Sequence, residues 1–145
     1  MINHNELDVQ NIILMFIIMI IASIFSGMNM WNNNISDVRI QLNDIYMGIS
    51  MTGWMFLLFG LFYSLSNYIY IGLVIIITSI YLIRNQIFIN QYQYLTSMIP
   101  HHSMAIFMSK KIKEKDIINN EELNNLVNNI IITQQQEIDL MKKNT

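Results

Sequence analysis

The chain contains no cysteine, so disulfide bonds and thiolate-ligated metal sites are excluded. Charged residues are also scarce: they make up 12% of the 145 residues, whereas soluble domains average about 25%. The formal net charge is −2, so there is no basic field that would attract nucleic acid, and we expect no nucleic-acid partner. In place of charge, the chain is 53% hydrophobic and carries 12 methionines.

Three long apolar segments occupy the first part of the chain, at residues 12–28, 46–65 and 68–83. Each approaches the ~20 residues that a helix needs to cross a hydrocarbon core. All three are apolar on every side, which is not the pattern of an amphipathic surface helix. We therefore predict an all-α, integral membrane protein, in which residues 1–84 form a membrane domain of three transmembrane helices in contact with the lipid bilayer.

The first apolar segment is interpreted as a membrane anchor rather than a cleaved signal. Glu6 and Asp8 precede it where a signal would carry basic residues, and no A-x-A cleavage site follows. Three spans place the 28–45 loop and the C-terminal tail on the same side of the membrane. Arg39, Arg84 and the lysines after residue 109 assign that side to the cytoplasm by the positive-inside rule.

Residues 85–145 are predicted to form an antiparallel helical hairpin. The turn is expected at 116–122, with Asn119 as the N-cap of the second helix. No glycine or proline follows Arg84 before Pro100, so the third span is free to continue into the first tail helix. Pro100 is the only proline in the chain and is expected to kink or restart that helix just before two histidines.

The helical periodicity of the tail predicts which side chains face each other. One stripe of the second helix, about 80° wide, contains Leu123, Val127, Ile130, Gln134, Glu137 and Met141. A similar stripe of the first helix contains Met98, His101, Ala105 and Met108. Pairing His101 with Glu137 centres the hairpin on residue 119, inside the predicted turn, and puts both polar clusters at the open end of the hairpin. Glu137 is thereby assigned to the buried side.

This arrangement gathers residues that bind transition metals. The candidate ligands are Met98, His101, His102, Met108, Glu137 and Met141. Gln134 and Met104 are expected to support them from the next layer. Imidazole with thioether suits Cu(I) or Ag(I), whereas imidazole with carboxylate suits Zn(II), Fe(II) or Cu(II), so residue type alone leaves the metal open.

Three further methionines, Met47, Met51 and Met55, recur every four residues and so share one helix face. This face is interpreted either as ordinary packing, in which methionine is a flexible filler, or as a thioether ladder that passes soft ions toward the tail.

The tail also carries a recognisable motif. Residues 98–108 read MIPHHSMAIFM, and residues 131–141 read IITQQQEIDLM. These stretches resemble the signature of the domain of unknown function 305 family, M-I-P-H-H-x-x-A-I-x-M followed by I-I-x-x-Q-x-x-E-I-x-x-M. Residues 43–47 with Met51 and Met55, residues 84–86 and Leu95 resemble its short membrane-anchored members. The resemblance implies a ferritin-like helical hairpin or bundle, an extracytoplasmic location in bacteria, and, for some members, copper or silver binding and tolerance.

These observations predict a membrane protein that binds a soft transition metal, with copper or silver leading, for metal handling or tolerance. No nucleophile–base pair, phosphate loop or cofactor motif is present, so no catalytic residue is assigned and an enzyme is the less favoured class. A first alternative is a structural or assembly protein, a homo-oligomer in which the His/Gln/Glu cluster is a hydrogen-bonded lock between helices. A second alternative is a metal-dependent oxidoreductase. The charge rule and the family resemblance disagree on the side of the membrane that holds the hairpin.

Overall fold

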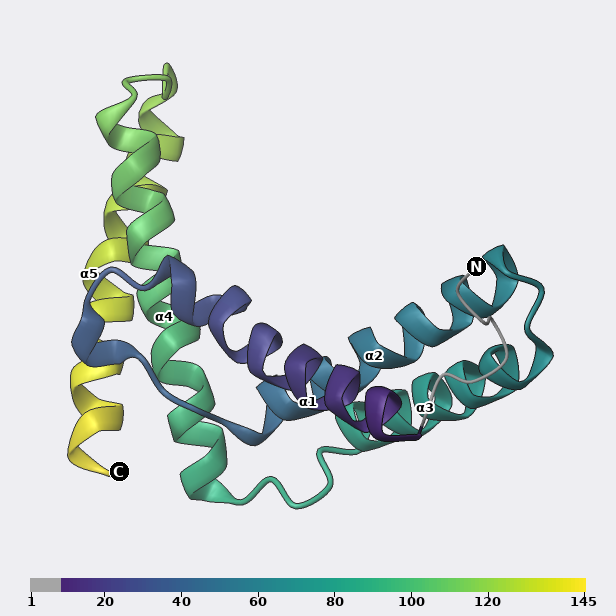
Figure 1. Ribbon diagram of the computed structural model, residues 1–145. Coiled ribbons are helices and arrows are strands. Elements are labelled where there is room, and N and C mark those ends of the chain that lie inside the picture. Colours follow the sequence, from purple (N-terminus) through teal and green to yellow (C-terminus); the bar gives the residue numbers. More distant parts are fainter. Residues whose placement is uncertain (1–8) are drawn as a thin grey trace. The chain divides into compact units, whose positions relative to one another are not determined.

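The structure is a computed structural model that describes residues 9–145, and their side chains from residue 13 onward. All regular structure in this part of the chain is helical (Figure 1), as the sequence predicts. The elements in chain order are α1 (Val9–Ser26), η1 (Met28–Trp31), η2 (Ile35–Asp37), α2 (Leu42–Phe62), α3 (Ser66–Arg84), α4 (Gln91–Glu114) and α5 (Glu121–Lys143). Glu6 and Asp8, which favour an anchor over a signal, lie outside the described residues.

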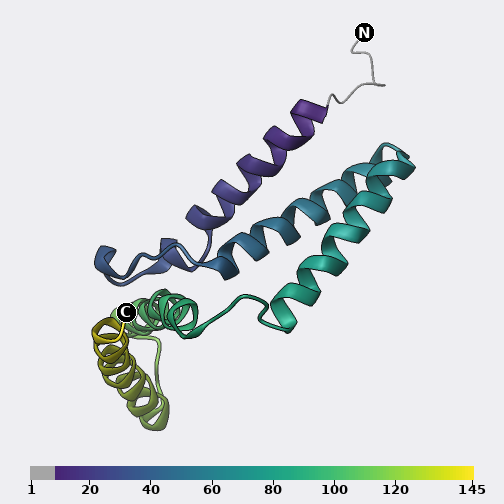
Figure 2. The same ribbon diagram turned by 90° about the horizontal axis from the view of Figure 1, so that it is seen from below.

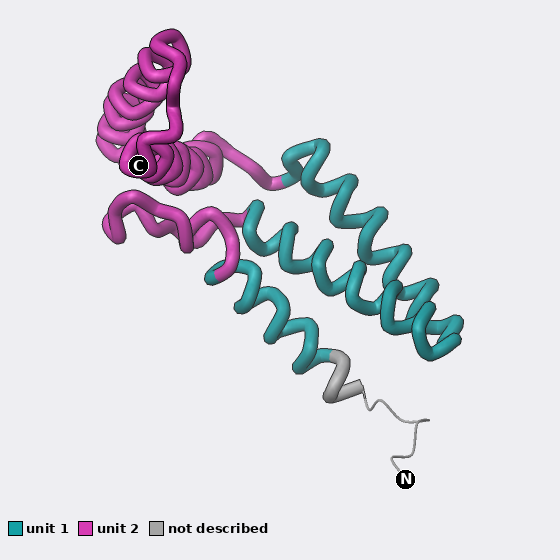
Figure 3. Tube along the Cα trace, turned by 90° about the horizontal axis from the view of Figure 1, so that it is seen from above, with its two compact units in different colours: residues 1–25, 43–87 teal, residues 26–42, 88–145 magenta. Residues whose placement is uncertain are grey.

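The chain divides into two compact units (Figure 3). The first contains residues 1–25 and 43–87, and the second contains residues 26–42 and 88–145. The compact units divide after residue 87, whereas the predicted domains divide after residue 84. The loop at 26–42, however, belongs with the C-terminal hairpin rather than with the apolar helices around it.

Three stretches of the chain are long and apolar enough, by length and composition, to cross a membrane as helices. The qualifying stretches are Ile13–Trp31, Leu42–Phe62 and Ser66–Arg84. Helices α2 and α3 run side by side in opposite directions (Figure 2). Their close approach depends on glycine, because a Cβ atom at Gly72 would lie 2.5 Å from the backbone nitrogen of Leu57 and 2.8 Å from the carbonyl oxygen of Gly53. Small residues allow such approach between helices whose outer surfaces are apolar.

Helices α3 and α4 are separate, which corrects the expectation that they could be continuous. Two non-glycine residues in the connecting segment, Gln86 and Phe88, have positive φ angles of 48° and 59°. Asn90 then caps α4 by accepting a hydrogen bond from the backbone N–H of Gln93 at 2.9 Å. Asparagine is a favoured N-cap residue because its side-chain oxygen accepts a backbone N–H of the first turn, and this signal is present in the sequence.

Helices α4 and α5 pack against each other as an antiparallel hairpin (Figure 1). The core of this hairpin consists of Ile99, Ile106, Ile138 and Met141. Pro100 lies inside α4, which continues through it to Glu114, so the predicted restart of the helix before the histidines is wrong. Asn120, one residue after the predicted cap, caps α5 by accepting hydrogen bonds from the N–H groups of Glu122 and Leu123.

Candidate functional site

The histidine pair lies about halfway along α4, not at the open end of the hairpin where the sequence placed it. His101 is exposed, whereas His102 is half-buried on the side that faces α5. Its Nδ1 atom lies 3.2 Å from Oε2 of Glu137. The two imidazole rings are 5.8 Å apart between centroids. The structure therefore pairs Glu137 with His102, and the predicted pairing with His101 is wrong by one residue.

The surroundings of His102 disfavour its protonated form. Burial lowers the pKa of His102 from its ordinary value of 6.5, and the nearby His101 adds to this effect. The Glu137 carboxylate opposes them but does not overcome the burial. The Nδ1 atom is enclosed and has no hydrogen-bond partner. Its contact with Glu137 is therefore close in distance without the alignment that a hydrogen bond requires.

Glu137 is on the edge of the α5 interface rather than in it. Its side chain is 52% exposed, which corrects its predicted burial. The buried stripe of α5 is centred on Ile138, with Met141 buried and Ile131 and Gln134 partly buried. Of the predicted stripe, Met141 is buried and Val127, Ile130 and Gln134 are partly buried, whereas Leu123 and Glu137 are exposed.

The thioethers predicted to surround the histidines occupy three kinds of place. Met141 belongs to the apolar core of the hairpin, and Met98 packs against that core. Met104 is half-buried on α4. Met108 is 56% exposed and lines a surface groove with Trp31 and Phe107. The structure thus gives Met98 and Met141 a packing role that needs no metal.

The described residues contain no group of three or more His, Asp or Glu side chains already arranged to hold a metal ion. Two of the three polar members of the cluster, His101 and Glu137, are exposed, so their side chains have room to rotate.

The methionines at positions 47, 51 and 55 lie along α2 in the other unit. Met47 and Met51 are exposed, and Met55 is half-buried. Exposed methionines on an apolar helix suit contact with lipid as well as a thioether ladder, so both interpretations remain predictions.

A buried carboxylate that the sequence analysis did not single out lies beside the histidine pair. Asp37, in η2, is only 3% exposed. Ser103, the residue after His102, donates a hydrogen bond to its Oδ2 atom at 2.6 Å. The Nζ atom of Lys142 lies 2.5 Å from its Oδ1 atom. One carboxylate therefore joins the 26–42 loop to both helices of the hairpin.

Further polar contacts fasten the same loop to α4. The backbone N–H of Asn33 donates to Oγ of Ser103 at 2.9 Å, and Lys110 donates to the side chain of Asn33 at 3.0 Å. The backbone N–H of Leu42 donates to the side chain of Gln93 at 3.3 Å. The charge of Asp37 between Ile35 and Val38 was the available signal, but the partners of Asp37 are 66 and 105 residues away in the chain.

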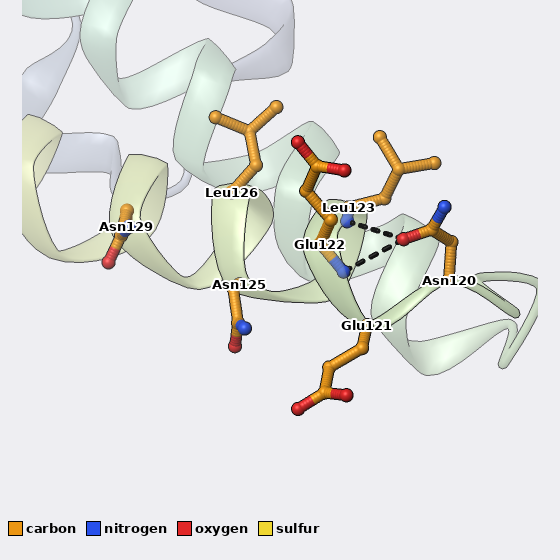
Figure 4. Close-up of a pocket in the computed structure, with 7 residues that line it drawn as sticks. All are labelled: Asn120, Glu121, Glu122, Leu123, Asn125, Leu126 and Asn129. Carbon is orange, nitrogen blue, oxygen red and sulfur yellow. Dashed lines mark hydrogen bonds between the residues drawn. The ribbon is translucent and has the colours of Figure 1, made fainter.

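A shallow depression at the start of α5 is separate from these residues (Figure 4). It is lined by Asn120, Glu121, Glu122, Leu123, Asn125, Leu126 and Asn129. The two dashed contacts in Figure 4 are the N-cap hydrogen bonds that the side-chain oxygen of Asn120 accepts from the backbone N–H groups of Glu122 and Leu123. The depression contains no histidine or methionine and takes no part in the candidate site.

The architecture defines a class of protein in which apolar helices precede a polar helical hairpin. In this hairpin, one of two adjacent histidines contacts a glutamate of the facing helix. Comparison with known proteins then identifies the family. The family model described as "Domain of unknown function (DUF305)" matches residues 89–145. "Uncharacterized protein L153" of Acanthamoeba polyphaga mimivirus is 42% identical over 135 residues, which are 90% of this chain and 88% of that protein. This chain belongs to the domain of unknown function 305 family. No solved structure matches it.

Proposed function

We propose that this protein is anchored in a membrane by α1, α2 and α3 and binds copper through its ferritin-like C-terminal hairpin. The support for the anchor is the length and apolar composition of the three helices. Their outer side chains, such as Ile77 and Leu58, are apolar and more than half exposed. A bilayer would cover this surface without any partner protein.

The observation that carries the metal proposal is the geometry at His102. Its enclosed Nδ1 atom has no hydrogen-bond partner and faces a carboxylate 3.2 Å away. A neutral imidazole with a free nitrogen is the form that binds metals. Rotation of the exposed His101 and Glu137 side chains adds a second nitrogen and an oxygen donor. We assign these three residues as the ligands, with Met104 and Gln134 as neighbours that support them.

Copper is favoured because it suits every donor set in this region. A site with two imidazoles and one carboxylate binds Cu(II) more tightly than the other divalent first-row metals. Imidazole with a thioether from Met98 or Met104 suits Cu(I). Zinc would be served by the imidazole–carboxylate set but not by the thioethers.

Copper binding by the full-length protein in detergent micelles tests this proposal. The protein is stripped with a chelator and titrated with Cu(II), and with Cu(I) under reducing conditions. We expect the affinity to fall by about 100-fold or more in His102→Ala and to fall also in His101→Ala, because changes even to residues behind the ligands cost about 10- to 100-fold. His4→Ala, which removes the third histidine of the chain, is the matched control. Unchanged affinity in both His101→Ala and His102→Ala would refute the proposal.

A structural lock is the competing function, and the same 3.2 Å contact favours it because it connects α4 to α5. Exposed leucines on α5, including Leu126 and Leu140, add a surface through which copies of the chain could assemble. In that case His102→Ala would weaken the hairpin or its assembly equally with and without copper, and copper would leave the wild-type protein's stability unchanged.

A further inference from the structure

A surface groove outside the candidate metal site combines an apolar lining with two lysines. Its volume is about 630 Å³, and it lies between η1, the second half of α4 and the start of α5. Trp31, Phe107, Met108, Ile112, Lys111 and Lys115 line it, together with Ile117 and Val127. All of these residues belong to the second compact unit.

The aromatic residues of the groove are held in place. The rings of Trp31 and Phe107 are in edge-to-face contact, 6.2 Å apart between centroids. The Nζ atom of Lys111 lies 5.9 Å from the centroid of the Phe107 ring. Trp31, Met108 and Ile117 are nevertheless exposed. An exposed apolar surface of this kind, bordered by charge, is typical of a contact with a membrane or another molecule.

The position of Trp31 in the chain favours a membrane lipid as the molecule that binds in the groove. Trp31 is the last residue of the apolar stretch Ile13–Trp31 and follows the end of α1 at Ser26 by five residues. Five residues reach at most about 18 Å, so a membrane-spanning α1 keeps this groove near the membrane surface. Tryptophan is itself enriched at that surface.

The charge of the groove matches an anionic lipid. Lys110, Lys111, Lys113 and Lys115 provide half of the eight lysines and arginines of the chain, against Glu114 and Asp116 in the same segment. Two lysines line the groove. Lys111 forms an ion pair with Glu114 at 2.6 Å, so the charge of Lys115 is the less neutralised of the two. An apolar lining beside ammonium groups suits a molecule with an acyl chain and a negative headgroup.

We propose that this groove binds an anionic phospholipid of the membrane in which the protein is anchored. The acyl chain lies against Trp31 and Phe107, and the phosphate is near Lys111 and Lys115. This inference rests on the proposed membrane anchor but not on the proposed copper site.

Quenching of tryptophan fluorescence by brominated lipids tests the proposal. The chain has two tryptophans, so Trp54→Phe isolates Trp31 in the groove, and Trp31→Phe isolates Trp54 within α2. The full-length variants are placed in nanodiscs of mixed phosphatidylcholine and phosphatidylglycerol. The acyl-chain bromine is carried at equal amount either by the neutral or by the anionic lipid.

We expect the brominated anionic lipid to quench Trp31 several-fold more than the brominated neutral lipid, and to quench Trp54 no more than the neutral lipid does. Lys111→Gln with Lys115→Gln should remove the preference at Trp31, because each lysine near an anionic surface contributes about fivefold to the attraction. Lys113→Gln with Lys143→Gln, which changes the charge equally outside the groove, should retain it. Millimolar inorganic phosphate in the buffer should leave the preference intact.

Three results would overturn the inference. Equal quenching of Trp31 by both lipids shows that no anionic lipid is selected. A preference that appears only when two protein copies share a nanodisc shows that a second copy shapes the groove. Absence of quenching at Trp54 shows that α2 is not in the bilayer, which overturns the membrane anchor as well. If Trp54 is quenched but Trp31 is quenched equally by the anionic and the neutral lipid, the membrane anchor stands and only the proposed lipid site in the groove is refuted.

Discussion

Replacing Asp37 by asparagine tests whether one buried carboxylate holds the 26–42 loop against the hairpin. The substitution keeps the shape of the side chain and removes its charge. It weakens two contacts at once, the hydrogen bond from Ser103 at 2.6 Å and the ion pair with Lys142 at 2.5 Å. Loss of these contacts should release the loop from the hairpin before the hairpin itself unfolds, because the helix core is formed by apolar residues elsewhere.

The expected cost follows from the burial of the partners. Removing one member of a fully buried ion pair costs about 3–5 kcal/mol, because the remaining charge is left without compensation. The side chain of Lys142 is 31% exposed, so water partly compensates its charge after the change. A charge-assisted hydrogen bond contributes about 1.5–3 kcal/mol. We therefore expect Asp37→Asn to destabilise the docked loop by about 2–3 kcal/mol.

Amide hydrogen exchange of the full-length protein measures this loss locally. The N–H groups of Asn33 and Arg39 are useful reporters because both donate hydrogen bonds within the second unit. A loss of 2–3 kcal/mol corresponds to exchange that is faster by about 30- to 140-fold. Asp139→Asn is the matched control, because Asp139 is exposed and bonds only to Gln135 on its own helix, so exchange in the loop should stay unchanged.

A second substitution distinguishes the ion pair from a general loss of packing. In Asp37→Asn with Lys142→Met, neither charge is left alone, so the double variant should be less destabilised than the sum of the two single changes. Strict additivity of the two single effects, or loop exchange in Asp37→Asn equal to that of the wild type, would refute the reasoning.

Two further predictions concern the histidine and the apolar helices. Burial lowers the pKa of His102 in the folded state, so the unfolded chain binds the extra proton more readily. The unfolding free energy of the copper-free protein should therefore rise with pH through the region below 6.5 and level off above it. His102→Gln should flatten this part of a pH series of denaturation curves, and an unchanged slope would assign the pH dependence to other groups. Gly72→Ala should push α2 and α3 apart at a cost of about 1–3 kcal/mol, because its Cβ atom would meet backbone atoms of the facing helix. Unfolding in mixed detergent micelles measures this cost; the exposed Thr78→Ala should be neutral, and equal stabilities of the two variants would contradict the close approach at Gly72.

The helices were predictable because their signals are local. Uninterrupted apolar runs located the three long helices to within a few residues. The polar tail and its predicted turn at 116–122 indicated the hairpin, although the predicted cap at Asn119 is one residue early and the cap at Asn90 was missed. The errors in predicting the helices occurred where a single residue determines whether a helix continues or ends. Pro100 was expected to kink or restart α4, yet the helix continues through it. A proline removes one backbone hydrogen bond, and the burial of Ile99 and Pro100 offsets this loss.

The candidate site was predictable in composition but not in register. An error of one residue rotates a helical side chain by about 100°, which is the difference between His101 in solvent and His102 against Glu137. Asp37 was out of reach for a different reason. Its partners are Ser103 and Lys142, and no periodicity connects residues so far apart in the chain.

Three consecutive residues of α4 therefore have three different surroundings. His101 faces solvent, His102 faces α5, and Ser103 faces the loop between α1 and α2. Successive helix positions diverge by about 100°, so a rotation of α4 large enough to move one of these contacts must move the other two. Asp37 joins that loop to both α4 and α5 through Ser103 and Lys142, so the loop is held against the same two helices on which His102 and Glu137 meet.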